Sequence, residues 1–109
     1  MYNIQAFIDS MGVEKEDAKP LFDAYLEEMK DMLVQLHAAN EKSDIDQLTR
    51  IMHNVKGINA NLMVEPLLQV ASQYYKDLQD QTANDHASQI TALANHYEEI
   101  AAVIQAFYQ

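Results

Sequence analysis

The stretch IMHNVKGINANLM, residues 51–63, places a histidine, a lysine and a glycine within about one turn of a predicted helix. An unprotonated imidazole such as that of His53 is a nucleophile, and the ammonium group of Lys56 can meet an anion held on that ring. A glycine at position 57 costs the helix about 1 kcal/mol relative to alanine. The helical pattern continues beyond Gly57, so we interpret this glycine as clearance that lets another molecule approach His53 closely.

The distribution of charge is compatible with an anion at this position. The chain of 109 residues has a formal net charge of −10, yet Arg50 and Lys56 are the only charged residues between Gln47 and Val64. So acidic a protein is not expected to bind nucleic acid, because neutralised phosphates supply much of that affinity. Two interpretations of the local positive charge stay open: an anion-binding site, or a helix whose other exposed residues happen to be neutral.

Helical periodicity predicts the direction in which His53 points. In a helix over residues 44–62 the apolar side chains centre near Leu48 and Val55. At about 100° per residue, His53 points roughly 160° away from that centre, toward solvent. Residues three and four apart are neighbours on a helix, so one exposed stripe runs along this face. The stripe comprises Thr49, His53, Lys56, Gly57 and Ala60.

Four long segments carry apolar residues at the spacing of one buried helical face. These segments run over residues 22–36, 45–62, 67–78 and 90–107, and a shorter apolar segment at residues 4–8 precedes them. Short links between long helices favour antiparallel neighbours. The sequence therefore predicts an all-α fold, an up-down-up-down antiparallel four-helix bundle with a short extra N-terminal helix.

Local residue types predict where these helices begin and end. Gly12 suits the left-handed end of the first short helix. Pro20 suits the first turn of the next helix, which we expect to begin near Val13 as a loose turn and to become regular only at the proline. Ser43 or Asp44 can cap the following helix, and the polar segment 80–85 separates the last two.

Composition limits the class of protein. The length suits one domain over residues 1–109, and the chain has no cysteine and therefore no disulfide. No apolar run approaches the roughly 20 residues of a membrane helix, and the first residues do not resemble a signal peptide. We expect a soluble, cytoplasmic protein without membrane contact. His37, His86 and His96 lack metal-ligand spacing and are expected at the surface or at helix edges, so no metal site is predicted.

The motif His53-Asn54-Val55-Lys56-Gly57, followed by Ala60-Asn61-Leu62, resembles the signature of histidine-containing phosphotransfer (HPt) domains of multistep phosphorelays. That signature is H-x-x-K-G followed by small residues and an apolar position. Residues 43–48 also resemble the family's entry into the helix that carries the histidine. The resemblance covers nearly the whole chain, and the length suits a single stand-alone domain.

The resemblance implies a phosphoryl carrier that is not itself an ATP-using enzyme. His53 would accept a phosphoryl group on Nε2 from the aspartyl phosphate of a response-regulator receiver domain and pass it reversibly to another receiver. A hybrid sensor histidine kinase is a further implied partner. Lys56 would offset phosphoryl charge, and Gly57 would leave room for the receiver. The chain is expected to bind no cofactor, because Mg²⁺ would come with the receiver and no G-x-x-x-x-G-K loop is present.

Some positions depart from the family's usual pattern. Ile58 and Asn59 follow the glycine where small or hydroxyl residues are frequent, and Met63 stands where a glycine is common. Many members also place Gln or Glu on the next helix to hydrogen-bond the imidazole Nδ1. Counting along the chain, that position falls at Tyr75, whose hydroxyl is a candidate for the same role.

Thr49, Ala60 and Tyr75 are the candidate binding residues around the histidine. The departures keep a second function open, in which an unphosphorylated HPt-like adaptor binds receiver or kinase partners. A structural helical bundle without any link to a phosphorelay is the third.

Overall fold

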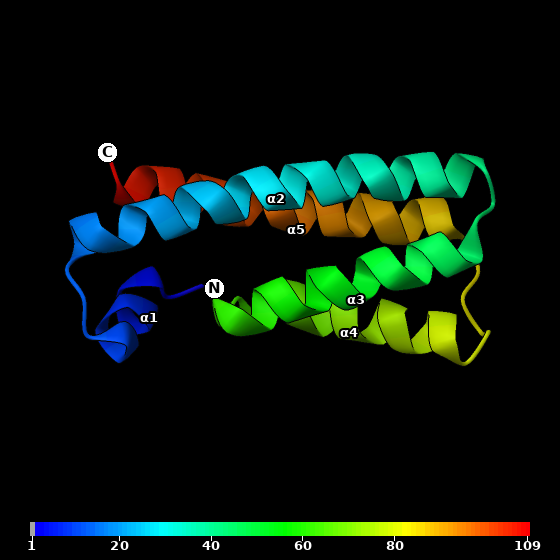
Figure 1. The fold of residues 1–109 in the computed structure, drawn as a ribbon, viewed down its shortest axis with the longest axis horizontal. Coiled ribbons are helices and arrows are strands. Elements are labelled where there is room, and N and C mark those ends of the chain that lie inside the picture. Colours follow the sequence, from blue (N-terminus) through cyan, green and yellow to red (C-terminus); the bar gives the residue numbers. More distant parts are fainter. Residues whose placement is uncertain (1) are drawn as a thin grey trace.

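A computed structural model of the chain describes residues 2–109, which form five α-helices and no strand. The all-α class and the short N-terminal helix are as predicted. The helices are α1 (Ile4–Met11), α2 (Lys15–Glu41), α3 (Ile45–Asn61), α4 (Glu65–Gln79) and α5 (His86–Phe107) (Figure 1).

The four longer helices lie side by side in an elongated molecule of 43 × 21 × 19 Å (Figure 1). Helix α3 packs against both α2 and α4, and α5 completes the bundle by packing against α2 and α4. The α2–α3 and α4–α5 links lie at one end of the molecule, and the α3–α4 link lies toward the other (Figure 1). Each link is short, so helices that follow one another in sequence are neighbours in space.

Helix α1 covers the end of the bundle near the start of α2. Phe7 and Ile8 are buried, whereas Met11 is exposed. The ring of Phe7 meets that of Phe22 on α2 at a centroid distance of 5.9 Å. The hydroxyl of Tyr2 donates a hydrogen bond of 2.9 Å to the carbonyl of Leu62, which fixes this cap to the end of α3.

Several helix ends follow the chemistry of their residues. Gly12 ends α1 with a left-handed φ of 69°. The side chain of Asp44 accepts a hydrogen bond from the backbone N–H of Gln47 and so caps α3. Asp85 caps α5 in the same manner through the N–H of Ser88.

The expectation that the second helix becomes regular only at Pro20 is wrong. Helix α2 is regular from Lys15, with Glu14 at its N-cap, so Pro20 lies inside the helix rather than in its first turn. Pro20 has no N–H to donate to the carbonyl of Glu16, one turn earlier. Both residues are exposed, so water can pair with that carbonyl, and the helix accepts the proline.

The apolar helix faces meet in one core to which every helix contributes. Phe22, Met29, Leu48, Leu67 and Ile90 illustrate its composition, and each is fully buried. Ile45, the first residue of α3, belongs to a predicted apolar face but is 41% exposed rather than buried. Within residues 2–109 the structure contains no helix that is both long enough and apolar enough to cross a bilayer.

Candidate functional site

His53 lies near the middle of α3, on the face that points away from the core. Met52 and Val55 are buried on the opposite side of the helix, whereas His53 is exposed. Successive side chains on a helix are separated by about 100°, so the same apolar spacing that buries α3 turns the imidazole outward. The histidine is therefore accessible to another molecule without any rearrangement of the bundle.

The remaining residues of the predicted stripe share this side of α3. Thr49 is half-buried, and its hydroxyl donates a hydrogen bond of 2.8 Å to the carbonyl of Ile45. Gly57 and Ala60 are exposed. A Cβ atom added to Gly57 would meet no atom within 4 Å. Packing within this chain therefore does not require a glycine at position 57.

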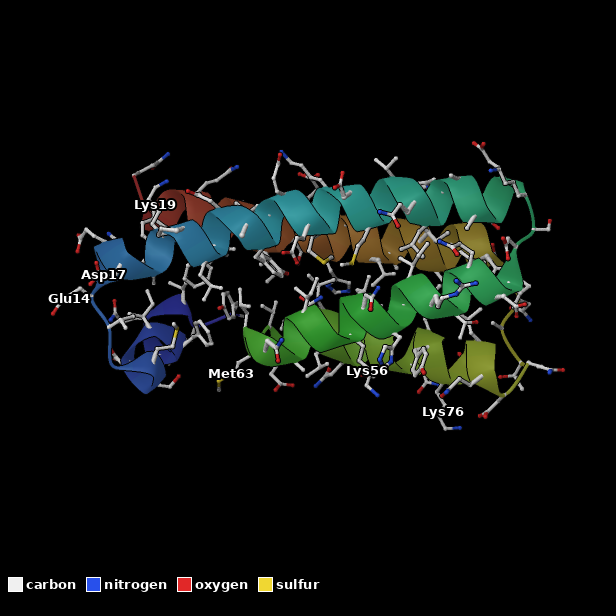
Figure 2. The ribbon with its side chains drawn as sticks, in the orientation of Figure 1. Glu14, Asp17, Lys19, Lys56, Met63 and Lys76 are labelled. Atoms are coloured by element: carbon white, nitrogen blue, oxygen red, sulfur yellow. The ribbon has the colours of Figure 1, made fainter. Side chains whose placement is uncertain are left out.

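Tyr75, on α4, contacts both His53 and Lys56 of α3. Its ring centroid lies 5.6 Å from that of His53, with the two planes tilted by 49°. The ammonium nitrogen of Lys56 lies 5.3 Å from the same Tyr75 centroid, a distance typical of a cation–π contact. In Figure 2, Lys56 projects from α3 on the side where α4 lies. The structure thus brings Tyr75 of α4 next to His53 and Lys56, which lie one turn apart on α3.

The hydroxyl of Tyr75 has a partner on its own helix. Gln79 Nε2 donates a hydrogen bond of 3.0 Å to this hydroxyl, four residues further along α4. Among residues 2–109, no hydrogen bond joins the Tyr75 hydroxyl to His53. Gln79 was not predicted as a site residue, although its i, i+4 spacing from Tyr75 is a sequence signal that could have identified it.

Two hollows flank His53. The first, the α3–α4 cleft, has a volume of about 750 Å³ and lies between α3, α4 and the link to α5. His53 and Tyr75 line it, together with Thr49, Arg50, Gln79 and His86. The second, the α2–α3 groove, is smaller at about 390 Å³. It is lined by His53 and by Glu28, Met32, Gly57 and Ile58.

The charged side chains of α3 nearest to His53 in sequence are positive, whereas Asp46 at the start of α3 and Glu28 across the α2–α3 groove are negative. Arg50 and Lys56 lie three residues before and after His53. Glu28 on α2 faces the same groove from the other helix. No group of three or more His, Cys, Asp or Glu side chains within residues 2–109 could hold a metal ion. The site offers cations and a nucleophile to an anionic reactant.

His86 makes a contact that sequence patterns did not predict. Its Nδ1 lies 2.8 Å from the hydroxyl of Tyr74, which joins the start of α5 to α4. Burial raises the pKa of Tyr74 to about 12. Tyr74 points into the core, whereas Tyr75, the next residue, points toward His53. Of these adjacent tyrosines, Tyr74 therefore belongs to the core and Tyr75 to the surroundings of His53.

Comparison with known proteins yields one match. The family model described as Hpt domain matches residues 20–103, a range that includes His53, Lys56 and Tyr75 and omits α1. No curated protein and no solved structure matches the chain significantly.

Proposed function

The chain belongs to the Hpt domain family, which has a phosphotransfer role in phosphorelay signalling, and from this premise we propose that His53 is its phosphoacceptor. His53 accepts a phosphoryl group from a receiver-domain aspartate and relays it to the aspartate of another receiver. The observation that carries this proposal is an exposed imidazole on α3 with Lys56 one turn away and a hollow on each side.

The proposed step exchanges one phosphorus bond for another. The lone pair of unprotonated Nε2 attacks phosphorus and forms the P–N bond, while the P–O bond to the receiver carboxyl breaks. The leaving carboxylate keeps the electron pair of that bond. The ring, which retains its proton on Nδ1, gains positive charge and can release that proton to water. The reverse sequence returns the phosphoryl group to an aspartate.

Lys56 and Gly57 have distinct roles in this proposal. The Lys56 ammonium donates to the phosphoryl oxygens and offsets their negative charge, which is largest while the group is in transit. Gly57 leaves open space beside the imidazole, so that the receiver can approach in line with Nε2. Thr49 and Ala60 extend the same face and contact the receiver on either side of His53.

The partner supplies the rest of the chemistry. We assign no cofactor to this chain, and Mg²⁺ belongs to the receiver, where it neutralises phosphoryl charge. The partners are receiver domains, including that of a hybrid sensor histidine kinase. A cytoplasmic location, where such receivers act, is part of this proposal.

A second function is supported by the environment of Tyr75. Its hydroxyl pairs with Gln79 rather than with the imidazole, so within residues 2–109 Tyr75 does not provide the hydrogen bond that orients the histidine in many family members. The chain would then act as an unphosphorylated adaptor that binds receivers or kinases. The two functions differ in one observable, the phosphoryl group on His53.

Intact mass at neutral pH, after incubation with a phosphorylated receiver, distinguishes them. We expect one added phosphoryl group on the wild type and its loss on brief acidification. His53→Gln should take up none. His37→Gln is a matched control, because His37 is also exposed but lies on α2. Receiver binding without any added mass would instead establish the adaptor.

A further inference from the structure

The contact between Tyr75 and the two functional residues of α3 suggests a positioning mechanism that does not need a hydrogen bond to His53. We propose that the ring of Tyr75 positions both His53 and Lys56 for transfer, and that Gln79 holds this ring in place through its hydroxyl. The proposal rests on the proposed function of His53. It assigns the positioning to the aromatic ring rather than to the hydroxyl.

The ring is placed to act on both side chains at once. His53 and Lys56 are one turn apart on α3, and Tyr75 approaches them from α4. Its centroid lies 5.6 Å from the imidazole centroid and 5.3 Å from the Lys56 ammonium nitrogen. Tyr75 is half-buried and packs against the core, so its own position is restricted by the bundle.

A tilted aromatic contact limits how the imidazole rotates. Aromatic pairs favour offset or tilted arrangements at centroid separations of about 4.5–7 Å, and the His53–Tyr75 pair falls within that range. An imidazole on an exposed helix face would otherwise sample several rotamers. If the imidazole is already restricted when the receiver binds, less conformational entropy is lost on reaching the geometry for transfer.

Lys56 is held beside the imidazole by a contact that it can exchange. Its ammonium group lies over the face of the Tyr75 ring, where the attraction is modest at a partly exposed site. A phosphoryl oxygen offers a stronger, charge-assisted hydrogen bond. We therefore expect Lys56 to leave the ring for the phosphoryl group when His53 is modified. The ring keeps the cation nearby without competing for it.

Gln79 completes the arrangement from within the α3–α4 cleft. Its Nε2 donates to the Tyr75 hydroxyl over 3.0 Å, along the same helix. Tilting of the phenol ring away from α3 would break this bond. Gln79 therefore acts on His53 through Tyr75 and is a positioning residue.

Transfer rates of variants at Tyr75 and Gln79 test the proposal. Phosphoryl uptake would be timed from a phosphorylated receiver and, separately, from phosphoramidate, a donor too small to need docking. We expect Tyr75→Leu to slow uptake about tenfold with both donors, because the ring contacts are lost. Tyr75→Phe and Gln79→Ala should each slow it about twofold, because both remove the same hydrogen bond.

The Tyr75→Phe/Gln79→Ala double variant is the sharpest comparison. If the two residues act through one hydrogen bond, the double variant is no slower than either single variant. Gln73→Ala is the matched control, because it removes another i, i+4 glutamine hydrogen bond on α4, to Asp77. The control should be labelled at the wild-type rate.

A spectroscopic readout separates positioning from stability. The carbon-bound protons of the His53 ring feel the ring current of Tyr75 in NMR spectra. Tyr75→Phe should preserve their chemical shifts more nearly than Tyr75→Leu, whatever the melting temperatures of the variants.

Two results would overturn the proposal. One is a Tyr75→Phe variant that is slowed about tenfold, like Tyr75→Leu, because the hydroxyl would then carry the effect. The other is a Tyr75→Leu variant that is slowed by only about twofold or less, because the ring contacts would then contribute nothing. By contrast, a wild type that neither donor labels would refute the proposed function itself.

Discussion

The rings of His53 and Tyr75 lie 5.6 Å apart, centroid to centroid, and are tilted by 49° across the α3–α4 interface. The phenol hydroxyl accepts a hydrogen bond from Gln79 Nε2, on its own helix. The exposed histidine is therefore bordered by an aromatic ring. Lys56 contacts the same ring, so His53 and Lys56 both pack against one side chain of the neighbouring helix.

The first prediction concerns Lys56. Lys56→Ala should slow phosphoryl uptake by His53 about tenfold, because a charge-assisted hydrogen bond to the phosphoryl oxygens is lost. Its free energy of unfolding should fall by less than about 1 kcal/mol, the size of a partly exposed cation–π contact. Rates of uptake and urea unfolding curves measure the two quantities.

Lys76→Ala is the matched control for Lys56. Lys76 is an exposed lysine on α4 that pairs with Asp80 over 2.7 Å. Its removal should leave uptake unchanged. A Lys56→Ala variant that loses several kcal/mol of unfolding free energy while keeping its transfer rate would make Lys56 a structural residue.

The second prediction concerns Gly57. A Cβ atom there meets open space, so Gly57→Ala should raise the free energy of unfolding by about 1 kcal/mol through better helix propensity. Gly57→Gln should nevertheless slow transfer from a receiver by at least about tenfold, because a longer side chain occupies the approach to His53. Slowing with phosphoramidate should be much smaller, since that donor needs little space.

Ala102→Gln provides the comparison for this substitution. Ala102 is exposed in α5, away from His53, and adding a glutamine there should not alter transfer. If Gly57→Gln transferred from the receiver as fast as this control, the clearance role of Gly57 would be refuted.

The parts of this architecture that depend on one helix at a time could be predicted from the sequence. Apolar spacing fixes which face of a helix is buried, so it also fixes the outward direction of His53. Gly12 and Asp44 marked helix ends because their effects are local. Pro20 does not mark the start of its helix, because a proline inside a helix is tolerated where water reaches the unpaired carbonyl.

Contacts between helices were less predictable. Two such contacts are the hydrogen bond between Tyr74 and His86 and the cation–π contact of Lys56 with Tyr75. Both depend on how far one helix is displaced along another. Periodicity gives the face of each helix but not that displacement. Counting along the family pattern is what predicts that Tyr75 lies near His53. The hydrogen bond between Gln79 and Tyr75 is not part of that pattern.

The third prediction concerns alkaline pH. Burial raises the pKa of Tyr74 to about 12 in the folded protein, above the ordinary value of 10.0. Below pH 10 the phenol is protonated in both states. Between pH 10 and 12 the unfolded chain loses a proton that the folded protein keeps, so the free energy of unfolding falls with rising pH. The contribution of Tyr74 is on the order of 2 kcal/mol.

Urea unfolding at pH 8, 10 and 11.5 measures this decline. Tyr74→Phe should be less stable than the wild type at pH 8 by about 1 kcal/mol, because its hydrogen bond with His86 is lost. Its stability should then fall less steeply above pH 10. Burial also raises the pKa of Tyr25, so part of the decline remains in the variant. Equal declines in both proteins would contradict the assignment to Tyr74.

The last prediction concerns Asn59, a fully buried polar residue that ties α3 to α2. Its Oδ1 accepts a hydrogen bond of 2.7 Å from the hydroxyl of Tyr25, and its Nδ2 donates one of 2.8 Å to the carbonyl of Val55. Asn59→Leu would leave the Tyr25 hydroxyl buried without a partner. We expect a loss of about 2 kcal/mol in the free energy of unfolding.

The Asn59→Leu/Tyr25→Phe double variant tests whether that unpaired hydroxyl is the cause. Removing the hydroxyl together with the amide should restore about half of the lost stability, because an apolar pair carries no desolvation penalty. Phosphoryl uptake per folded molecule should change little, since Asn59 lies on the buried face of α3 and His53 on the exposed one. If the double variant were less stable than Asn59→Leu alone, packing around the Tyr25 ring, rather than its hydroxyl, would account for the loss.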